Sequence, residues 1–182
     1  MAELWVFGYG SLMWQPGFAF TERVPAALIG AHRSLCIYSF HHRGTQERPG
    51  LVLGLDEGGA CRGIAFRVAA GKRDETVAYL RAREQVTDVY VEAIKQVSLL
   101  DGSGRQCDAL CYMADRSHPQ YAGRLSLARQ AALVQSAIGL AGGNVEYVLN
   151  TVRHLEELGI HDAELAALAK RLTATPGGAP KT

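Results

Sequence analysis

A glycine-containing turn close to the N-terminus holds the first residues whose types could do chemistry. The apolar run that includes Val6 and Phe7 breaks there into Gly8, Tyr9, Gly10, Ser11 and Leu12. Because glycine has no side chain, the backbone amides of such a turn can bind a carboxylate or an oxyanion. The same glycines are expected in a tight turn with a purely structural role. Spacing alone favours the structural interpretation and leaves the binding interpretation open.

Three familiar motifs do not fit this turn. A dinucleotide-binding fingerprint needs a third glycine at the position that Met13 occupies. A nucleophile elbow needs glycine two residues before and two residues after the serine, where this chain has Tyr9 and Leu12. The sequence contains no glycine-rich phosphate loop ending in Gly-Lys-Ser or Gly-Lys-Thr. Ser11 is therefore not placed as a hydrolase nucleophile.

A single glutamate at the end of a predicted helix is the second candidate. Val77, Leu80 and Glu84 are spaced three and four residues apart, so all three share one helix face with the core residues. An acid in that position either pairs with a cation or has its pKa raised by desolvation, as a general base for neutral pH requires. Arg81 and Arg83 are close in sequence, so both interpretations stay open.

The cysteines and histidines predict neither a disulfide framework nor a metal site. Cys107 and Cys111 lie in a segment that reads as a strand, where their sulfurs start ~13 Å apart, too far for a disulfide or a shared ion. We expect them to be small core residues. The histidines outside residues 41–42 show no ligand spacing. They are His32, His118, His154 and His161.

Short runs of strand-forming residues occupy the first two thirds of the chain. We expect strands over residues 4–9, 26–30 and 34–40, a hairpin of 50–55 and 61–68 around Asp56–Gly59, and a hairpin of 89–100 and 105–114 around Asp101–Gly104. A helix over 74–84 with Asp74 as its N-cap separates the two hairpins.

Helical periodicity dominates the last third. One apolar stripe runs from Leu127 to Ile138, a second ends before Gly159, and a third spans Leu165 to Leu172. Strands followed by helices predict an α+β fold, with a curled or closed sheet and helices outside. We expect a single domain over residues 1–172 and a disordered tail over 173–182.

The bulk composition narrows the function classes. The 182 residues are 48% hydrophobic and 20% charged, with a formal net charge of +1 and no run of basic residues. We therefore expect no nucleic-acid or membrane partner. The N-terminus lacks the features of a secretory signal, so we expect a cytoplasmic protein, and by default a monomer.

Several segments together resemble the ChaC-type gamma-glutamylcyclotransferases, and most closely their bacterial branch. These segments are WVFGYGSLMW, HHRGTQERPGLVLGL, CRGIAFRV, REQVTDVY and GGNVEYVLNTVRHLEELGI, in the same order from about residue 4 to about residue 160. The resemblance implies a small, mostly closed mixed β-barrel with flanking helices. It also implies an enzyme without metal or organic cofactor that cleaves glutathione into 5-oxoproline and cysteinylglycine.

The resemblance also assigns roles by position. It implies that the turn Tyr9–Leu12, with Val6, Phe7 and Gly8 leading in, holds the gamma-glutamyl group, and that Glu84 is the catalytic glutamate. A tyrosine before the helical third, here Tyr121, would also face the substrate. The chain departs from many members after Glu84, where residues 85–90 replace a Lys-Gly-Gly-Tyr segment. This departure bears on substrate preference rather than on catalysis.

Two other functions compete with glutathione cleavage. The same fold and Glu84 would also serve an enzyme for other gamma-glutamyl amino acids or amines, or the chain could be a noncatalytic binding module. The loop of residues 41–48, with two histidines and two arginines, could attract the glycine carboxylate of glutathione. We favour the interpretation that this loop is solvated.

Overall fold

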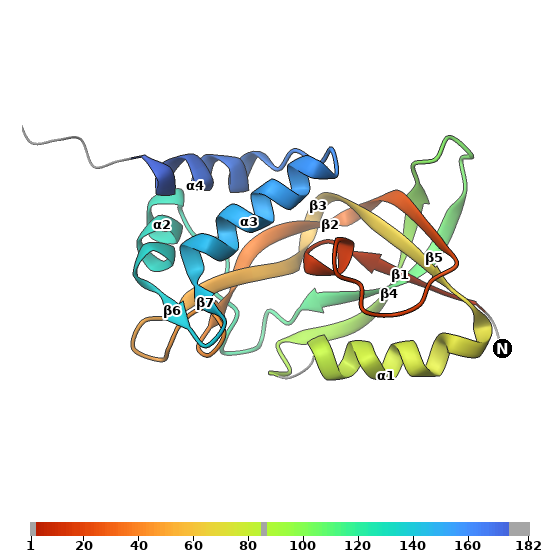
Figure 1. Ribbon diagram of the computed structural model, residues 1–182, viewed down its shortest axis with the longest axis horizontal. Coiled ribbons are helices and arrows are strands. Elements are labelled where there is room, and N and C mark those ends of the chain that lie inside the picture. Colours follow the sequence, from red (N-terminus) through yellow and green to blue (C-terminus); the bar gives the residue numbers. More distant parts are fainter. Residues whose placement is uncertain (1–2, 85–86, 175–182) are drawn as a thin grey trace, which may run out of the picture. The chain divides into compact units, whose positions relative to one another are not determined.

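The computed structural model describes residues 3–84 and 87–174 (Figure 1). The chain divides into two compact units, described in turn below. The first unit comprises Met1–Tyr38 and Val52–Gly123, and the second Ser39–Leu51 and Arg124–Thr182. The expected single domain over 1–172 stays a prediction.

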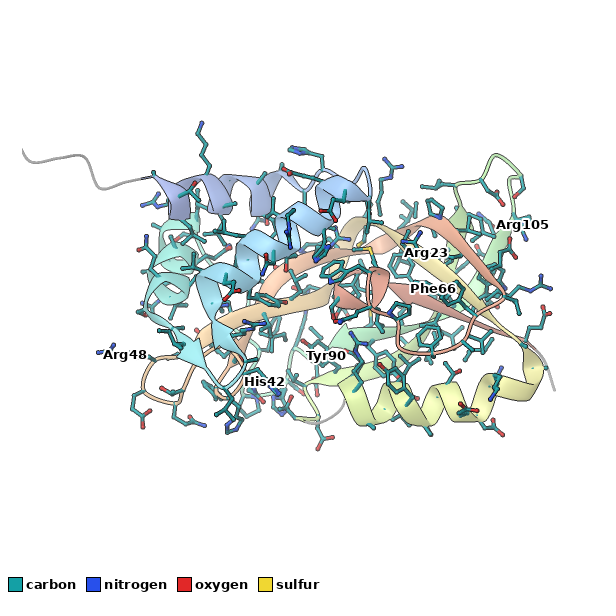
Figure 2. The ribbon with its side chains drawn as sticks, in the orientation of Figure 1. Arg23, His42, Arg48, Phe66, Tyr90 and Arg105 are labelled. Atoms are coloured by element: carbon teal, nitrogen blue, oxygen red, sulfur yellow. The ribbon has the colours of Figure 1, made fainter. Side chains whose placement is uncertain are left out.

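A closed five-stranded barrel forms most of the first unit. Its strands, in the order β1-β3-β2-β4-β5, are β1 (Leu4–Gly8), β2 (Glu22–Ser39), β3 (Gly50–Val68), β4 (Tyr90–Leu99) and β5 (Gln106–Ala114). β1 pairs antiparallel with β3 and parallel with β5, with Trp5 opposite Ala109. Phe66 is fully buried inside this unit, whereas Arg105 lies at the exposed end of the β4–β5 hairpin (Figure 2). The α+β class and the closed barrel are thus confirmed.

The predicted hairpin at Asp56–Gly59 was wrong, because residues 50–68 form one continuous strand. Gly58 and Gly59 adopt positive φ angles of 92° and 70°, which bend the strand locally without reversing it. The carbonyl of Gly58 is hydrogen-bonded to Nδ1 of His32 on β2 at 2.9 Å. The two predicted segments 26–30 and 34–40 likewise belong to one strand, β2.

The first strand and the second hairpin were predicted correctly. β1 covers Leu4–Gly8, and β4 and β5 pair antiparallel around the turn at Asp101–Gly104. Cys107 and Cys111 lie on β5, opposite Val97 and Ala93 of β4.

Helix α1 (Arg73–Glu84) follows a short 3-10 turn, η2 (Ala70–Lys72). Asp74 lies inside the first helical turn rather than at the N-cap, because the helix begins one residue earlier. Leu80 is fully buried and belongs to a core cluster with Val6, Leu12 and Tyr112. This packing fixes the helix face that carries Glu84.

Three helices and a two-stranded ribbon form the second unit together with residues 39–51. They are α2 (Leu127–Ser136), β6 (Ile138–Gly139), β7 (Gly142–Gly143), α3 (Asn144–Glu157) and α4 (Ala163–Thr173). The first predicted apolar stripe was too long, since Ile138 lies in β6 and is 69% exposed. Helix α4 includes Thr173, which we had assigned to the tail, and residues 175–182 lie outside the described residues. None of the helices described is both long and apolar enough to cross a membrane.

A buried asparagine holds the start of β3 in the second unit. The Asn144 side chain accepts a hydrogen bond from the Leu51 amide and donates one to the Leu51 carbonyl, both at 2.8 Å. Both residues are buried, so this side chain satisfies backbone groups that water does not reach.

We expect Asn144→Ala to lower the free energy of unfolding by about 1–3 kcal/mol, because it leaves two buried backbone groups of Leu51 without partners. Urea denaturation measures this loss. Asn150→Ala is the matched control on the same helix, since Asn150 is exposed and its side chain accepts a hydrogen bond from the exposed Arg153. Equal effects of both substitutions would contradict this role of Asn144.

Candidate active site

The turn after β1 presents three backbone amides in a row. The 3-10 turn η1 (Ser11–Met13) begins directly after Gly10, and the Met13 amide donates to the Gly10 carbonyl at 2.9 Å. The Ser11 carbonyl accepts from the amide of Gln15 at 2.8 Å. Among the residues described, we find no hydrogen bond donated by the amides of Gly10, Ser11 or Leu12. These are the orphan donors of a helical start, and they can receive an oxyanion or a carboxylate.

The side chains that lead into the turn are committed to the core. Val6 and Leu12 belong to the cluster around Leu80, and Phe7 is 1% exposed. A Cβ at Gly63 of β3 would collide with the Gly8 carbonyl oxygen and the Phe7 ring, so glycine is required there. Of the predicted binding segment, the backbone and the exposed Ser11 side chain are therefore the parts available to a ligand.

Glu84 ends helix α1 with a largely buried carboxylate. Its side chain is 18% exposed, and its Oε1 lies 3.3 Å from Nε of Arg83. Burial raises the pKa of Glu84 above its ordinary value, and the positive charge of Arg83 offsets part of that rise. The sequence left open whether Glu84 is paired with a cation or desolvated. The structure shows both, since the carboxylate is largely buried and lies next to Arg83.

Arg83 brings the two candidate segments together. Its Nη2 donates to Oγ of Ser11 at 2.8 Å, and its Nη1 donates to the carbonyl of Gln15 at 2.7 Å and to the hydroxyl of Tyr79 at 2.9 Å. The same guanidinium therefore contacts the helix end that carries Glu84 and the turn after β1. In the sequence, Arg83 was considered only as an ion-pair partner.

A second arginine, missed in the sequence, supports the turn from the barrel wall. Arg33 of β2 is 7% exposed, and its Nε donates to the Tyr9 carbonyl at 2.6 Å while its Nη2 donates to the Arg62 carbonyl at 2.7 Å. In a trans peptide the C=O and N–H point in opposite directions, so this bond also fixes the direction of the Gly10 amide. No local sequence signal identified this residue, because its partners Tyr9 and Arg62 are 24 and 29 positions away in the chain.

Arg81, the other arginine considered as a partner for Glu84, is engaged elsewhere. Its Nε donates to Glu92 of β4 at 2.7 Å, and the same carboxylate accepts from the Tyr112 hydroxyl at 3.1 Å. The Arg81 hydrogen bonds hold the pKa of Glu92 below its usual value. This group ties α1 to the barrel and leaves Arg83 as the partner of Glu84.

Tyr121 donates its hydroxyl to Asp56 at 2.8 Å, and Arg116 donates to the other oxygen of the same carboxylate at 2.8 Å. Burial would raise the pKa of Asp56, but the hydrogen bonds from Arg116 and Tyr121 outweigh it and hold that pKa below its usual value. Contact of Tyr121 with a substrate stays a prediction.

The four cysteines are all free thiols in buried or half-buried positions. Burial raises the pKa of Cys36 to about 12, of Cys107 to about 11 and of Cys111 to about 12. Thiols with such values are overwhelmingly protonated at neutral pH and are poor nucleophiles.

The basic loop of residues 41–48 lies in the second unit, and it is mostly exposed. His42 and Arg48 point outward in Figure 2, and both are exposed. Arg43 donates to the carbonyl of Gly143 at 3.3 Å and lies over the ring of Tyr147. The expected solvated loop is confirmed for most of its side chains.

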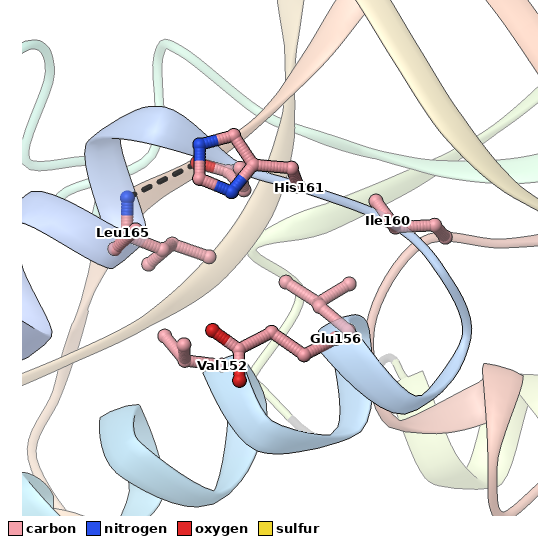
Figure 3. Close-up of a pocket in the computed structure, with 8 residues that line it drawn as sticks. Val152, Glu156, Ile160, His161 and Leu165 are labelled. Carbon is pink, nitrogen blue, oxygen red and sulfur yellow. Dashed lines mark hydrogen bonds between the residues drawn. The ribbon is translucent and has the colours of Figure 1, made fainter.

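A small pocket in the second unit does not overlap the candidate residues. It lies between the end of α3 and the start of α4, beside the hydrogen bond from the Leu165 amide to Asp162 (Figure 3). It has room for about one water molecule. We assign it no role in binding a substrate.

The first unit is a closed mixed barrel with a turn of unbonded backbone amides at the end of β1. Arg83 links this turn to the largely buried carboxylate of Glu84, and these features together define a class of protein. A family model described as "ChaC-like protein" matches residues 4–175. The chain belongs to the ChaC family.

Curated relatives agree with this assignment, and a solved structure agrees with the fold. The chain is 36% identical over 159 residues to the glutathione-specific gamma-glutamylcyclotransferase of Escherichia coli (strain K12), covering 87% of this chain and 68% of the relative. It is 32% identical over 171 residues to the glutathione-specific gamma-glutamylcyclotransferase 1 of Homo sapiens, covering 91% and 76%. A crystal structure of a yeast gamma-glutamylcyclotransferase specific to glutathione superimposes with a TM-score of 0.83 at 22% identity, covering 94% of this chain and 96% of the other. The family resemblance and the fold that it implied are confirmed.

We expect Glu84→Gln to stabilise the protein at neutral pH. Burial raises the pKa of Glu84, so the folded chain favours the protonated carboxyl and loses stability as pH rises from the unfolded pKa of about 4.3 to the higher folded pKa. The amide cannot ionise, so its advantage should be complete above the folded pKa, shrink as pH falls toward about 4.3 and vanish below that value. Thermal unfolding across this range measures the difference. Glu75→Gln is the control, since that side chain is 71% exposed, and a loss of stability at every pH in Glu84→Gln would indicate a structural ion pair instead.

Proposed function

We propose that this chain is a glutathione-specific gamma-glutamylcyclotransferase that releases 5-oxoproline and cysteinylglycine. The observation that carries the proposal is the buried Glu84 carboxylate joined through Arg83 to a turn with unbonded amides. The names of the curated relatives support glutathione as the substrate.

The substrate supplies its own nucleophile in this reaction. The α-amine of the gamma-glutamyl group attacks its own gamma-carbonyl carbon, a new C–N bond closes a five-membered ring, and the bond to the cysteinyl nitrogen breaks. Two protons move from the α-nitrogen to the departing nitrogen, so neither water nor an oxidant is consumed. An enzyme nucleophile is unnecessary, which agrees with the absence of an elbow at Ser11 and with the protonated thiols.

Glu84 would move the protons. An α-amine is mostly protonated at neutral pH, so a base must accept a proton before the nitrogen can attack. A carboxylate whose pKa is raised by burial is a stronger base than an exposed one, and after it has accepted a proton it stays protonated up to a higher pH. It can therefore return a proton to the departing amine.

The turn after β1 would stabilise the tetrahedral oxyanion. The amides of Gly10, Ser11 and Leu12 supply fixed donors, and the Arg33 bond to the Tyr9 carbonyl holds the first of them in place. Holding the gamma-glutamyl chain in a folded conformation lowers the barrier further, because ring closure is fast once the reacting atoms are aligned.

We infer a cytoplasmic monomer that needs neither metal nor organic cofactor. Four free thiols support a reducing compartment. The chemistry above supports the absence of a cofactor, since every proton and bond is supplied by the substrate and Glu84. Light scattering of the purified protein tests the oligomeric state.

Incubation of the purified protein with reduced glutathione and a chelator should give 5-oxoproline and cysteinylglycine in equal amounts by mass spectrometry. Equal amounts follow because ring closure expels the dipeptide without consuming water. Gamma-glutamyl-alanine, assayed in parallel, should react more slowly. Free glutamate would indicate hydrolysis, faster turnover of gamma-glutamyl-alanine would indicate the broader substrate class, and binding without turnover of either would indicate a binding module.

Glu84→Gln should reduce kcat by about 10²- to 10⁴-fold, as expected for the loss of a general base. The substitution is nearly isosteric, so the folded structure should persist by circular dichroism. Glu75→Gln on the same helix should retain the parent rate, because that carboxylate is exposed and contacts Lys72. A folded Glu84→Gln variant with the parent rate would rule out Glu84 as the base.

A further inference from the structure

One guanidinium has five hydrogen-bonding or charged neighbours among the described residues of the candidate site. Arg83 is only 23% exposed along its side chain. Its partners are Oε1 of Glu84, Oγ of Ser11, the Gln15 and Pro16 carbonyls and the Tyr79 hydroxyl, all in the first unit. An exposed arginine that merely confers solubility does not make this set of contacts.

We propose that Arg83 is a positioning residue that locks the Glu84 carboxylate to the turn after β1 and directs the Ser11 hydroxyl hydrogen toward the substrate. The proposal rests on the proposed function, because it assigns Glu84 as the base and the turn as the binding segment.

Helix geometry makes the contact between Arg83 and Glu84 unusual. Consecutive residues on a helix point about 100° apart and do not normally face each other. Here the hydrogen bonds to Gln15 and Tyr79 anchor the guanidinium. Its Nε then lies 3.3 Å from Glu84, so the anchors determine where the charge sits. A lysine could restore the charge but not these simultaneous contacts, because its ammonium is a compact point charge.

The hydrogen-bond direction at Ser11 has a consequence for ligand binding. A hydroxyl has one hydrogen to donate and two lone pairs to accept. Arg83 can only donate, so Ser11 Oγ is the acceptor in this pair. The Ser11 hydrogen is left to point at a carbonyl or carboxylate oxygen of the substrate.

Of the charged groups near Glu84, Arg83 has the strongest effect on the pKa of its carboxyl. Arg83 is the cation recorded beside Glu84 in the described part of the chain, and the nearby Tyr112 hydroxyl donates to Glu92. Arg81 is held by that same Glu92. Removing Arg83 would leave burial to act on the carboxylate without the opposing charge, so its pKa would rise further.

The test compares Arg83→Met with Lys72→Met, which removes an exposed positive charge just before the same helix, in kcat/KM for glutathione against pH. We expect Arg83→Met to lose on the order of tenfold more kcat/KM at about pH 6 than at about pH 8.5, because its base is protonated over a wider range. Lys72→Met should keep the parent profile. An Arg83→Met profile parallel to that of the parent would overturn the proposal.

A second variant separates positioning from charge and covers a failure of Arg83→Met to fold. Arg83→Lys should keep the acid limb of the profile near that of the parent and still lose on the order of tenfold in kcat/KM, since the Ser11 and Glu84 contacts cannot both persist. Parent-like kcat/KM in a folded Arg83→Lys would overturn the positioning role.

A readout without substrate distinguishes this proposal from the proposed function. Carbon-13 NMR of glutamate side-chain carboxyls, with the Glu84 signal assigned by Glu84→Gln, should show the Glu84 titration midpoint at higher pH in Arg83→Met than in the parent. An unchanged midpoint would overturn the proposal even if glutathione is turned over. A parent without turnover would contradict the proposed function alone, and the midpoint would still decide the role of Arg83.

Discussion

The double pairing of β1 is the constraint on which the rest of the first unit depends. This five-residue strand is hydrogen-bonded on one side to β3 and on the other side to β5, so neither of its edges is free. The position and direction of Gly8, its last residue, are therefore fixed. They also determine where the following turn begins. Arg33 and Arg83 add bonds from β2 and α1 to the same turn. A turn fixed by four different elements is the kind of preorganised donor set that stabilises a developing charge.

The burial of the Glu84 carboxylate is an unfavourable feature of the candidate site. Burial of Glu84 opposes its ionisation, and the neighbouring Arg83 compensates only in part. The hydrophobic packing of Leu80 and the ion pair of Arg81 with Glu92 hold the helix in place, and the Glu84 carboxylate stays largely buried. The contacts that hold α1 therefore offset the unfavourable free energy of burying an ionised carboxylate at its end.

Local patterns predicted those parts of the molecule whose cause lies within a few residues. The β4–β5 hairpin, the helix face of Glu84 and the strand before Gly8 follow from alternation, turn residues and helical spacing. The bend at Gly58 and Gly59 was misread as a reversal because a glycine pair supports either outcome, and pairing with distant β2 selects between them. The roles of Arg33 and Arg83 were missed for a related reason. Their partners at Tyr9 and Ser11 are 24 and 72 positions away in the chain, beyond the reach of any local periodicity.

The parallel pairing of β1 with β5 also determines when the barrel can close during synthesis. Trp5 and Val6 meet Ala109 and Leu110, so the barrel cannot close until about 100 further residues have left the ribosome. At roughly 5–20 residues per second, the apolar first strand waits for about 5–20 s without its final neighbour. A nascent chain is therefore exposed to aggregation through β1 for that interval, and the turn after β1 becomes rigid only once β5 has been synthesised.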